Sequence, residues 1–543
     1  MDYNCIRTDA LVIGGGVTGY MAAYGIQKDK KVTLLATGRG ASPHITGFNY
    51  VFADGDSIEC FIKDSFESGR YQNDPALVKT LCEGSAKTVP FLYELGMDLD
   101  MDGDSFRAKR PVGSSFPRVI GKNNVTGGII INLLREKLDA QDNFTAMDGT
   151  RALRLLVKNK RVMGAFCYNT VKKEFVCIEA DAVILAAGGF CKVFGFNTNT
   201  EDMGADGIAM AYGAGLPLID MEFVQFEPSG TLWPEEVAGH GMVTTVLFEG
   251  GKLLNKDGER FMFKYSEKGE QVNKDELGRG IYREVLAGNA GPHGGMLFDC
   301  TNVPSERMHT AYELYYKRYM GCGVDITKEP IEVFPAAHTA LGGVKINPDC
   351  STEIEGLFAC GEIVGGLHGA NRLGGSAGTE TQVFGQIAGE TAGKYLAGCR
   401  KASAEDADWN TLIKDLSAEA SAKPMSDAEM DAARKEMGSI LSDKFNVLRE
   451  GKSMEEGSIR IEQILKAVKA SAKPSDNDLC YKRIRLINDL ESAWLFTLCA
   501  MERKDSVGAH WRTDYESASP KPYRIEIRNQ GFEKPLILKT NIN

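Results

Sequence analysis

Residues 9–19 are Asp-Ala-Leu-Val-Ile-Gly-Gly-Gly-Val-Thr-Gly, and this stretch decides the fold of the chain. Ala10–Ile13 is a short apolar run typical of a buried parallel strand, and a helix-compatible segment follows the glycines. The pattern G-x-G-x-x-G between them consists of Gly14, Gly16 and Gly19. The first glycine permits a tight turn, the second lets the backbone approach a pyrophosphate, and the third allows close packing of helix on strand. The stretch therefore predicts a dinucleotide site at a helix N-terminus.

A second predicted strand, Lys31–Ala36, follows at the spacing of a βαβ unit. A carboxylate usually stands at the end of this strand and binds a ribose hydroxyl, but this chain has Ala36-Thr37 there. The ribose contact must therefore come from elsewhere or be lost. These residues leave open whether the dinucleotide is NAD or FAD. A G-x-G-x-x-G pattern alone is also compatible with a purely structural turn, so its interpretation depends on the rest of the chain.

The composition is that of a globular protein with several domains. The chain has 543 residues, 43% hydrophobic and 25% charged, and this length predicts about two to four domains. The net charge of −11 is spread without a basic block, which argues against nucleic acid or an anionic membrane as the main partner. No signal peptide precedes the first strand, and no apolar run approaches the roughly 18 residues of a spanning helix. We therefore expect a cytoplasmic protein without a transmembrane segment.

The 13 cysteines contain no C-x-x-C pair and no close cluster. Iron–sulfur and structural zinc sites normally show grouped ligands, so we expect reduced, mostly buried thiols and no metal site. Electrons that the chain handles must then pass through an organic cofactor or leave for another subunit.

Four segments with different patterns predict the domains. Residues 1–225 contain the glycine stretch and form the first part of the dinucleotide-binding domain. Residues 226–337 separate two cofactor-type stretches, so we expect an inserted domain that can close over a ligand. Cofactor-type glycine patterns return in 338–400. Residues 401–543 contain few β-branched residues and predict a helical domain, with strand-like alternation only at Tyr523–Arg528.

Three stretches in the first segment alternate enough to predict a small antiparallel meander: 154–157, 161–167 and 174–178. A separate buried strand is expected from Ala180 into the double glycine Gly188-Gly189.

Four separated pieces of sequence carry a more specific signal. They are GGGVTG (14–19), AVILAAGG (182–189), HTALGGV (338–344) and HGANRLGGSAGTE (368–380). In this order they resemble the flavoprotein subunits of the fumarate reductase, succinate dehydrogenase and L-aspartate oxidase family, over nearly the whole chain. The resemblance implies an α/β fold: a Rossmann-like FAD-binding domain with an inserted α+β capping domain and a C-terminal helical domain.

The resemblance also implies FAD as the cofactor, held by the positions that match the family: Gly14, Gly16, Gly19, Ser42, Thr126, Gly127, Gly188, Asp206, Glu362 and Ser376. Glu362 can accept a hydrogen bond from a ribose hydroxyl. The helix that begins near Ser376 can direct its positive end at the N1–C2=O region of the flavin, which favours the anionic reduced state. Simpler structural readings remain for Gly188 as a turn residue and for Asp206 as a helix cap.

The activity implied by the resemblance is reduction of an activated C=C bond, or dehydrogenation of the saturated counterpart. This chemistry needs a hydride from flavin N5, a proton, and cations that hold a carboxylate of the substrate. By resemblance, His338 and Arg372 match the carboxylate-binding positions, and arginine suits this role because its planar fork pairs bidentately with a carboxylate. Arg279 is the nearest match to the proton-donating arginine of the family, which has Arg-Asp where this chain has Arg-Gly. Alternatively, Arg279 or Arg283 is a solvated helix charge.

One departure from the family bears on the substrate. Glu227-Pro-Ser-Gly230 stands where fumarate reductases have His-Pro-Thr, so an anionic side chain replaces a substrate-binding histidine. At ~4 Å and an effective dielectric near 20, two like charges repel by a few kcal/mol. A dicarboxylate is therefore disfavoured. Glu227 instead suits a cationic, hydroxylated or amide-bearing substrate, or it acts as a base.

A second departure bears on the proton path. The Glu and Arg of the family's proton relay fall on Thr244 and Leu247, and leucine cannot carry a proton. Either the reaction is not fumarate reduction or another relay operates, for which Glu227, Glu249 and His240 are the candidates.

Some family members attach FAD covalently through a histidine soon after the second strand. Here Ser42-Pro-His-Ile offers His44, displaced by one residue and preceded by proline. We therefore expect noncovalent FAD.

Three other functions remain open from the sequence: an L-aspartate-oxidase-like amine dehydrogenase, a steroid dehydrogenase on a similar FAD fold, and a non-catalytic subunit whose FAD relays electrons. For an enzyme with a small unsaturated or saturated acid as substrate, we expect electrons to be exchanged with a separate protein, such as an iron–sulfur subunit.

Overall fold

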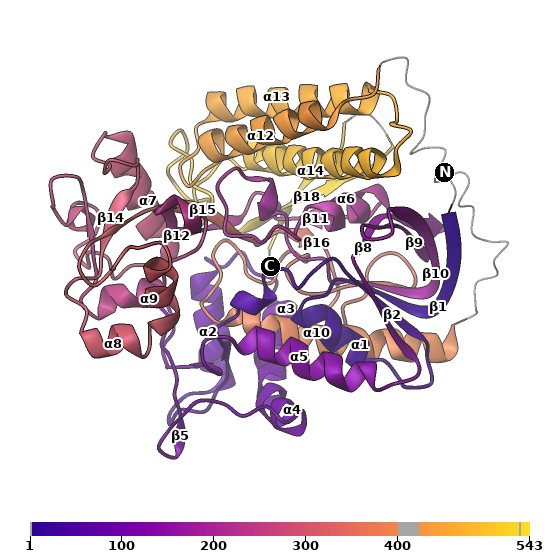
Figure 1. Cartoon of the computed structure of the whole chain (residues 1–543), viewed down its shortest axis with the longest axis horizontal. Coiled ribbons are helices and arrows are strands. Elements are labelled where there is room, and N and C mark those ends of the chain that lie inside the picture. The colour runs from indigo at the N-terminus through magenta and orange to yellow at the C-terminus, as the bar shows by residue number, and fades with distance from the viewer. Residues whose placement is uncertain (1–2, 400–422, 532–533, 543) are drawn as a thin grey trace.

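A seven-stranded sheet carries the glycine stretch, in the order β7-β2-β1-β10-β9-β8 with β17 beside β10. The computed structural model describes residues 3–399, 423–531 and 534–542. The mutually parallel strands are β7 (Phe144–Asp148), β2 (Val32–Ala36), β1 (Tyr3–Ile13), β10 (Glu174–Leu185) and β17 (Leu357–Ala359). Helix α1 (Val17–Gly25) follows β1 directly, which confirms the predicted strand, turn and helix. It packs with α5 (Thr126–Asp139) and α10 (Ser376–Gly398) below the sheet in Figure 1.

The predicted meander is present, but its last strand and the buried strand predicted after it are one continuous strand, β10 (Glu174–Leu185). Strands β8 (Thr150–Lys158) and β9 (Arg161–Asn169) are antiparallel, and β9 pairs with the first half of β10. The second half of β10 is the buried strand predicted to begin at Ala180. No turn residue separates the two halves at Glu179-Ala180, so the chain stays extended and joins the meander to the parallel part of the sheet.

A second, antiparallel sheet has the strand order β12-β15-β14-β13. Its elements are β12 (Val224–Trp233), β13 (Lys252–Leu254), β14 (Met296–Asp299) and β15 (Ile331–Ala340), with helices α7 (Lys274–Leu286), α8 (Ser305–His309) and α9 (Glu313–Met320). These elements share their own apolar core, which runs from Val237 to Val333, and lie at the left of Figure 1. We propose that they form the capping domain, with boundaries at 226 and 337.

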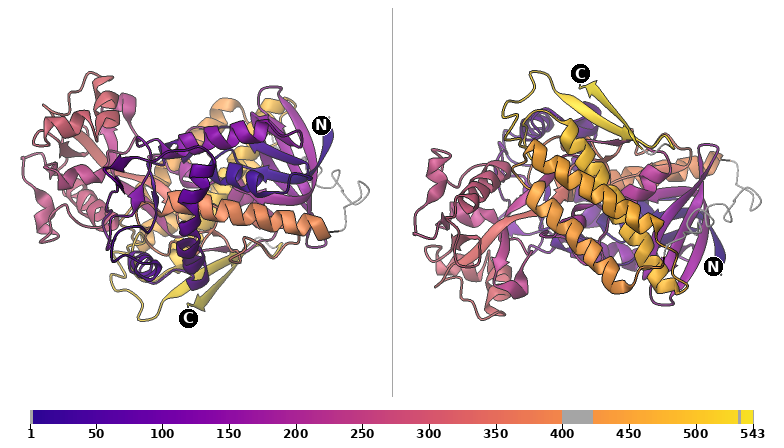
Figure 2. Two further views of the ribbon diagram at one scale, coloured as in Figure 1. Left: turned by 90° about the horizontal axis from the view of Figure 1, so that it is seen from below. Right: turned by 90° about the horizontal axis from the view of Figure 1, so that it is seen from above.

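Three long helices lie at the top of Figure 1, on the side opposite α1, α5 and α10: α12 (Asp427–Lys444), α13 (Gly451–Ala470) and α14 (Asn477–Glu502). The view from above in Figure 2 (right) shows them side by side, as the composition of the tail predicts. The predicted strand at 523–528 is β18 (Tyr523–Arg528), which pairs with β11 (Leu218–Ile219) and β19 (Leu536–Asn541). Residues 401–422 of the predicted tail, and residue 400 before it, lie outside the described residues. Among the described helices, none has both the length and the apolar character needed to cross a bilayer.

The two long strands of the capping sheet continue toward the FAD-type sheet and carry predicted site residues. Glu227 lies in β12 and His338 in β15, and the register pairs Glu227 with Ala336 and Phe226 with Ala337. Adjacent strands thus hold both side chains at the junction of the two domains.

Candidate functional site

One large cavity, with a volume of about 530 Å³, has walls from both the FAD-type domain and the capping domain. The turn after β1, the segment after β2 and the loop before α10 form one end. Strands β12 and β15 and the start of α7 form the other. We call these the cofactor end and the substrate end.

The cofactor end is built largely from backbone that tolerates no side chain. Gly14 has a φ of +134°, and a Cβ there would lie 2.1 Å from the carbonyl oxygen of Ala186. A Cβ at Gly15 would lie 2.4 Å from the carbonyl oxygen of Gly38. Gly16, the N-cap residue of α1, has no side chain to cap the helix, and Ser42 Oγ accepts from the first N–H of α1, that of Val17, at 3.0 Å. A helix N-terminus behind a glycine cradle fits a pyrophosphate, so these residues fit a dinucleotide.

The structure divides the predicted cofactor residues into two groups. Those that line the cavity are Gly14, Gly16, Ser42, Gly188, Asp206 and Glu362. Those that do not are Gly19, Thr126, Gly127 and Ser376, which lie behind the wall. A Cβ at Gly19 would lie 1.9 Å from the carbonyl oxygen of Gly14, so Gly19 permits helix α1 to pack on the turn.

The other three residues behind the wall hold in place the segments that line the cavity. Thr126 donates from Oγ1 to the carbonyl oxygen of Thr46 at 2.8 Å. A Cβ at Gly127 would lie 2.1 Å from the carbonyl oxygen of Ser42. Ser376 is the first residue of α10, and its hydroxyl accepts a hydrogen bond from Asn49. These residues shape the cavity wall without facing the cavity.

The two predicted carboxylates of the cofactor end differ. Each oxygen of Asp206 already accepts a hydrogen bond, from Asn488 Nδ2 and from Arg151 Nη1, both at 2.8 Å. Burial would raise the pKa of Asp206, but Arg151 and Arg485 outweigh it and the pKa is lowered. Among the described residues, Glu362 accepts only from the backbone, with Ala340 N at 3.0 Å, and burial raises its pKa to about 7. Of the two carboxylates, Glu362 is therefore the one that a hydroxyl donor on a ligand stabilises more.

At the substrate end, Arg372 and His338 lie close together. Arg372 donates from Nη2 to Oγ1 of Thr339 at 3.4 Å, its Nε is buried without a partner among the described residues, and its side chain lines the cavity. His338 Nδ1 is 2.7 Å from the hydroxyl of Thr198, and burial, helped by the charge of Lys274, lowers its pKa to about 3. The imidazole is neutral, and with Thr198 donating to Nδ1 its proton is on Nε2. Both side chains thus offer N–H donors to an anion.

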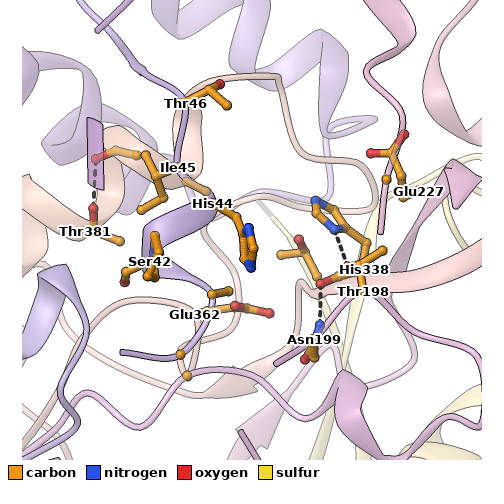
Figure 3. A pocket seen from close by; sticks show the side chains of 18 of the residues that line it. Ser42, His44, Ile45, Thr46, Thr198, Asn199, Glu227, His338, Glu362 and Thr381 are labelled. Atoms are coloured by element: carbon orange, nitrogen blue, oxygen red, sulfur yellow. Dashed lines mark hydrogen bonds between the residues drawn. The ribbon is translucent and has the colours of Figure 1, made fainter. Parts of the chain in front are cut away.

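Glu227 also lines the cavity, but as half of an ion pair. Its Oε1 accepts from the hydroxyl of Ser229 at 3.0 Å, and its Oε2 accepts a short hydrogen bond from Lys274 Nζ. Burial would raise the pKa of Glu227, but the charge of Lys274 outweighs this effect and the pKa is lowered. Figure 3 shows the imidazoles of His44 and His338 facing the same space, with Glu227 beyond His338.

The structure does not bring Arg279 into this cavity. Its Nη1 donates to Asp275 Oδ2 and to the carbonyl oxygen of Gly508, both at 3.1 Å, and its guanidinium lies 4.2 Å from the ring centroid of Trp511. The first residue of α7, Lys274, lines the cavity instead. Lys274 is not among the residues predicted from the sequence, although Lys274-Asp275 would have matched the family's Arg-Asp pair if lysine had been accepted in place of arginine.

The candidates for another proton path are also placed. Thr244 and His240 line the cavity, whereas Leu247 lies in the apolar core of the capping domain. Glu249 is bound by both Arg307 Nε and Arg307 Nη2, at 2.6 and 2.7 Å, and does not line the cavity. His44 lines the cavity, with its ring centroid 6.4 Å from that of His240. Glu227 is therefore the predicted relay carboxylate that reaches the substrate end.

Comparison with known proteins gives one consistent result. An FAD binding domain matches residues 9–377, and the C-terminal part of fumarate reductase flavoproteins matches residues 434–529. The chain is 33% identical to one of the subunits of the CoM/CoB fumarate reductase of Methanothermobacter marburgensis, over 99% of this chain and 100% of the relative. It is 30% identical to L-aspartate oxidase of Vibrio cholerae, over 94% and 96%. The structure resembles a variant of E. coli quinol fumarate reductase, with a TM-score of 0.90 and 26% identity over 99% and 97% of the two chains.

Proposed function

Because the chain belongs to the flavoprotein family of fumarate reductase, succinate dehydrogenase and L-aspartate oxidase, we propose a substrate class for this FAD-dependent oxidoreductase. It reduces an activated C=C bond of a small carboxylate-containing substrate other than plain fumarate, or dehydrogenates the saturated counterpart. The observation that carries the proposal is the arrangement at the substrate end, where Arg372 and His338 share a cavity with the Glu227–Lys274 ion pair.

Arg372 and His338 hold the carboxylate that activates the double bond. The guanidinium supplies a permanent positive charge, and the neutral imidazole adds an N–H donor at low cost in desolvation. Both side chains are largely removed from water, so their hydrogen bonds to an anion are stronger than at a surface. Withdrawing electrons through that carboxylate polarises the C=C bond toward addition at the far carbon.

FAD bound at the cofactor end would supply the two-electron chemistry, which is hydride exchange with a substrate carbon. The protein must then supply or remove one proton at the neighbouring carbon. Lys274 takes this role in place of Arg279, because its ammonium group lines the cavity and Arg279 does not. Glu227 orients the ammonium group and, after transfer, stabilises the return of a proton to the amine.

The same ion pair supports exclusion of a dicarboxylate. Lys274 cancels the charge of Glu227, so this end of the cavity offers little net attraction to a second anion. It offers instead one acceptor and one donor, which suit a hydroxyl or amide group. We therefore propose an enoate with a single carboxylate and a polar, uncharged far end.

The experiment that tests the proposal is a substrate panel. The purified yellow protein is assayed with reduced viologen against monocarboxylate enoates, with and without distal hydroxyl or amide groups, and against fumarate. Turnover of the polar monocarboxylates above that of fumarate is expected. Turnover of fumarate alone would refute the substrate class.

A second candidate is oxidation of an amino acid. The observation that favours it is Glu227, a buried carboxylate that can accept a hydrogen bond from a substrate ammonium group, together with the 30% identity to an L-aspartate oxidase. Turnover of amino acids with an oxidised dye, and of no enoate with a reduced one, would support this candidate against the first.

For the electron donor or acceptor, we propose a separate electron-transfer protein of the iron–sulfur type. One relative is named as one of the subunits of a fumarate reductase, which supports an assembly with another protein chain.

A further inference from the structure

The end of β2 lacks the carboxylate that a dinucleotide site usually places there. Residues 36–40 are Ala-Thr-Gly-Arg-Gly, and none of them can accept a hydrogen bond through a carboxylate. In dinucleotide-binding folds that carboxylate binds the ribose of the adenosine half. Thr37, Gly38, Arg39 and Gly40 nevertheless line the cofactor end of the cavity, so an adenosine ribose has to find its acceptor nearby.

Asp202 brings a carboxylate to this place from 165 residues further along the chain. Its Oδ2 accepts from the backbone N–H of Gly40 at 2.7 Å. Its carbonyl oxygen accepts from Arg151 Nη2 at 2.5 Å and from the hydroxyl of Thr37 at 3.3 Å. Main chain and side chain of Asp202 are therefore both fixed against the segment after β2.

The glycines of this segment accommodate the carboxylate. A Cβ at Gly38 would lie 2.0 Å from Asp202 Oδ2, so any side chain at position 38 would displace it. A Cβ at Gly40 would meet only the side chain of Met203, at the ordinary van der Waals distance of 3.8 Å, among the described residues. The absence of a side chain at position 38 thus has a reason beyond the turn itself, because it leaves room for Asp202.

The second oxygen of Asp202 is available to a ligand. Oδ1 accepts no hydrogen bond from any described residue, and Asp202 lines the cavity. Asp206 offers no such oxygen, because Asn488 and Arg151 occupy both of its oxygens. A carboxylate that lines the cavity with one oxygen anchored and the other without a partner among the described residues is suited to accept hydrogen bonds from a vicinal diol.

We propose that Asp202 binds the ribose diol of the adenosine half of FAD and replaces the carboxylate missing from the end of β2. Its anchored oxygen keeps the side chain in position through Gly40, and Oδ1 accepts from the ribose hydroxyls. The negative charge also disfavours a nucleotide that carries a phosphate on this ribose.

The proposal is tested by measuring how tightly the wild type and a variant bind FAD and its analogues, rather than by turnover. Apoprotein from riboflavin-starved cells is titrated by fluorescence with FAD and with FAD analogues that lack the adenosine 2′- or 3′-hydroxyl. The wild type should bind at least one deoxy analogue about tenfold more weakly, equivalent to about 1.4 kcal/mol. Asp202→Asn should bind FAD about tenfold more weakly and discriminate little between FAD and that analogue.

The control is Glu201→Gln, which removes an exposed neighbouring carboxylate that pairs with Lys192 at the surface. It should bind and discriminate like the wild type. ADP and deoxy-ADP serve as second probes, because they contain the same ribose and cannot attach to the protein through a flavin. Equal affinity of the wild type for FAD and both deoxy analogues would overturn the proposal even if Asp202→Asn did not fold. So would full discrimination by a folded Asp202→Asn protein.

Discussion

The two ends of the cavity differ in whether backbone or side-chain groups form most of the wall. The cofactor end consists largely of glycine turns and helix N-termini, where Cβ atoms would clash, with a few carboxylates beside them. The substrate end consists of charged and polar side chains on β12, β15 and α7. Backbone geometry cannot change without loss of the fold, whereas side chains can be exchanged on a fixed framework. With this division, side chains at the substrate end can be exchanged without a change in the backbone of the cofactor end.

The largest effect is expected from a substitution that changes the substrate end alone. Arg372→Ala should lower kcat/KM by about 10³-fold, because a buried group that pairs with a substrate charge contributes roughly 2–5 kcal/mol. Arg372 does not contact the glycine turn after β1, so the protein should remain yellow with unchanged FAD content. Steady-state kinetics and the visible spectrum measure the two ends separately.

Arg372→Lys is the matched variant, because it keeps the charge and loses the bidentate fork. It should recover part of the activity. Unchanged electron transfer in Arg372→Ala, with a physiological partner present, would instead support a subunit that only relays electrons.

A second comparison lies within α7, between Lys274 and Arg279. Lys274→Gln should lower kcat about 100-fold, because a proton donor contributes about 10²–10⁴-fold to such a step. Lys274→Arg keeps a cationic donor at this position and should retain part of the rate. Steady-state kinetics measure both effects.

Arg279→Gln is the control, since this side chain packs on Trp511 and donates to Gly508. It should lower thermal stability more than it lowers kcat. A loss of rate in Arg279→Gln that equals or exceeds that in Lys274→Gln would show that the proton donor had been assigned to the wrong cation.

A third variant exchanges the substrate preference. Glu227→His removes the negative charge and leaves the charge of Lys274 uncancelled, so a second carboxylate gains a net attraction at this end of the cavity. The ratio of kcat/KM for fumarate to that for a polar monocarboxylate enoate should rise about 10- to 100-fold, in keeping with a charge interaction of a few kcal/mol. An unchanged ratio would mean that Glu227 does not set the preference.

The contrast between the two ends also determines what the sequence can predict. Glycine patterns have one physical meaning in a strand–turn–helix context, so the fold, the FAD site and the position of Gly14 follow from short stretches of sequence. Lys274 and Arg279 are five residues apart on one helix, and only the rotation of α7 decides which of them faces the cavity. Asp202 carries no local signal, because it meets the end of β2 only in the folded chain.

The smallest expected effect belongs to the cofactor end and concerns stability rather than rate. Burial raises the pKa of Glu362 from an ordinary value of 4.5 to about 7 in the protein without ligand. A carboxyl group whose folded-state pKa is raised contributes stability that is fully present below about pH 4.5 and is lost as the pH rises through about 7. The apoprotein should therefore lose stability between pH 5 and pH 8.

Glu362→Gln isolates this contribution, because glutamine imitates the protonated group and does not titrate. The difference in Tm between the Glu362→Gln and wild-type apoproteins should grow by a few degrees from pH 5 to pH 8, in favour of the variant. Glu222, another buried carboxyl with its pKa raised to about 7, titrates in both proteins and cancels in the difference. Parallel curves of Tm against pH would show that Glu362 is solvated or paired in the apoprotein. Addition of FAD should reduce the difference, because a hydroxyl group of the bound cofactor can stabilise the ionised carboxylate of the wild type.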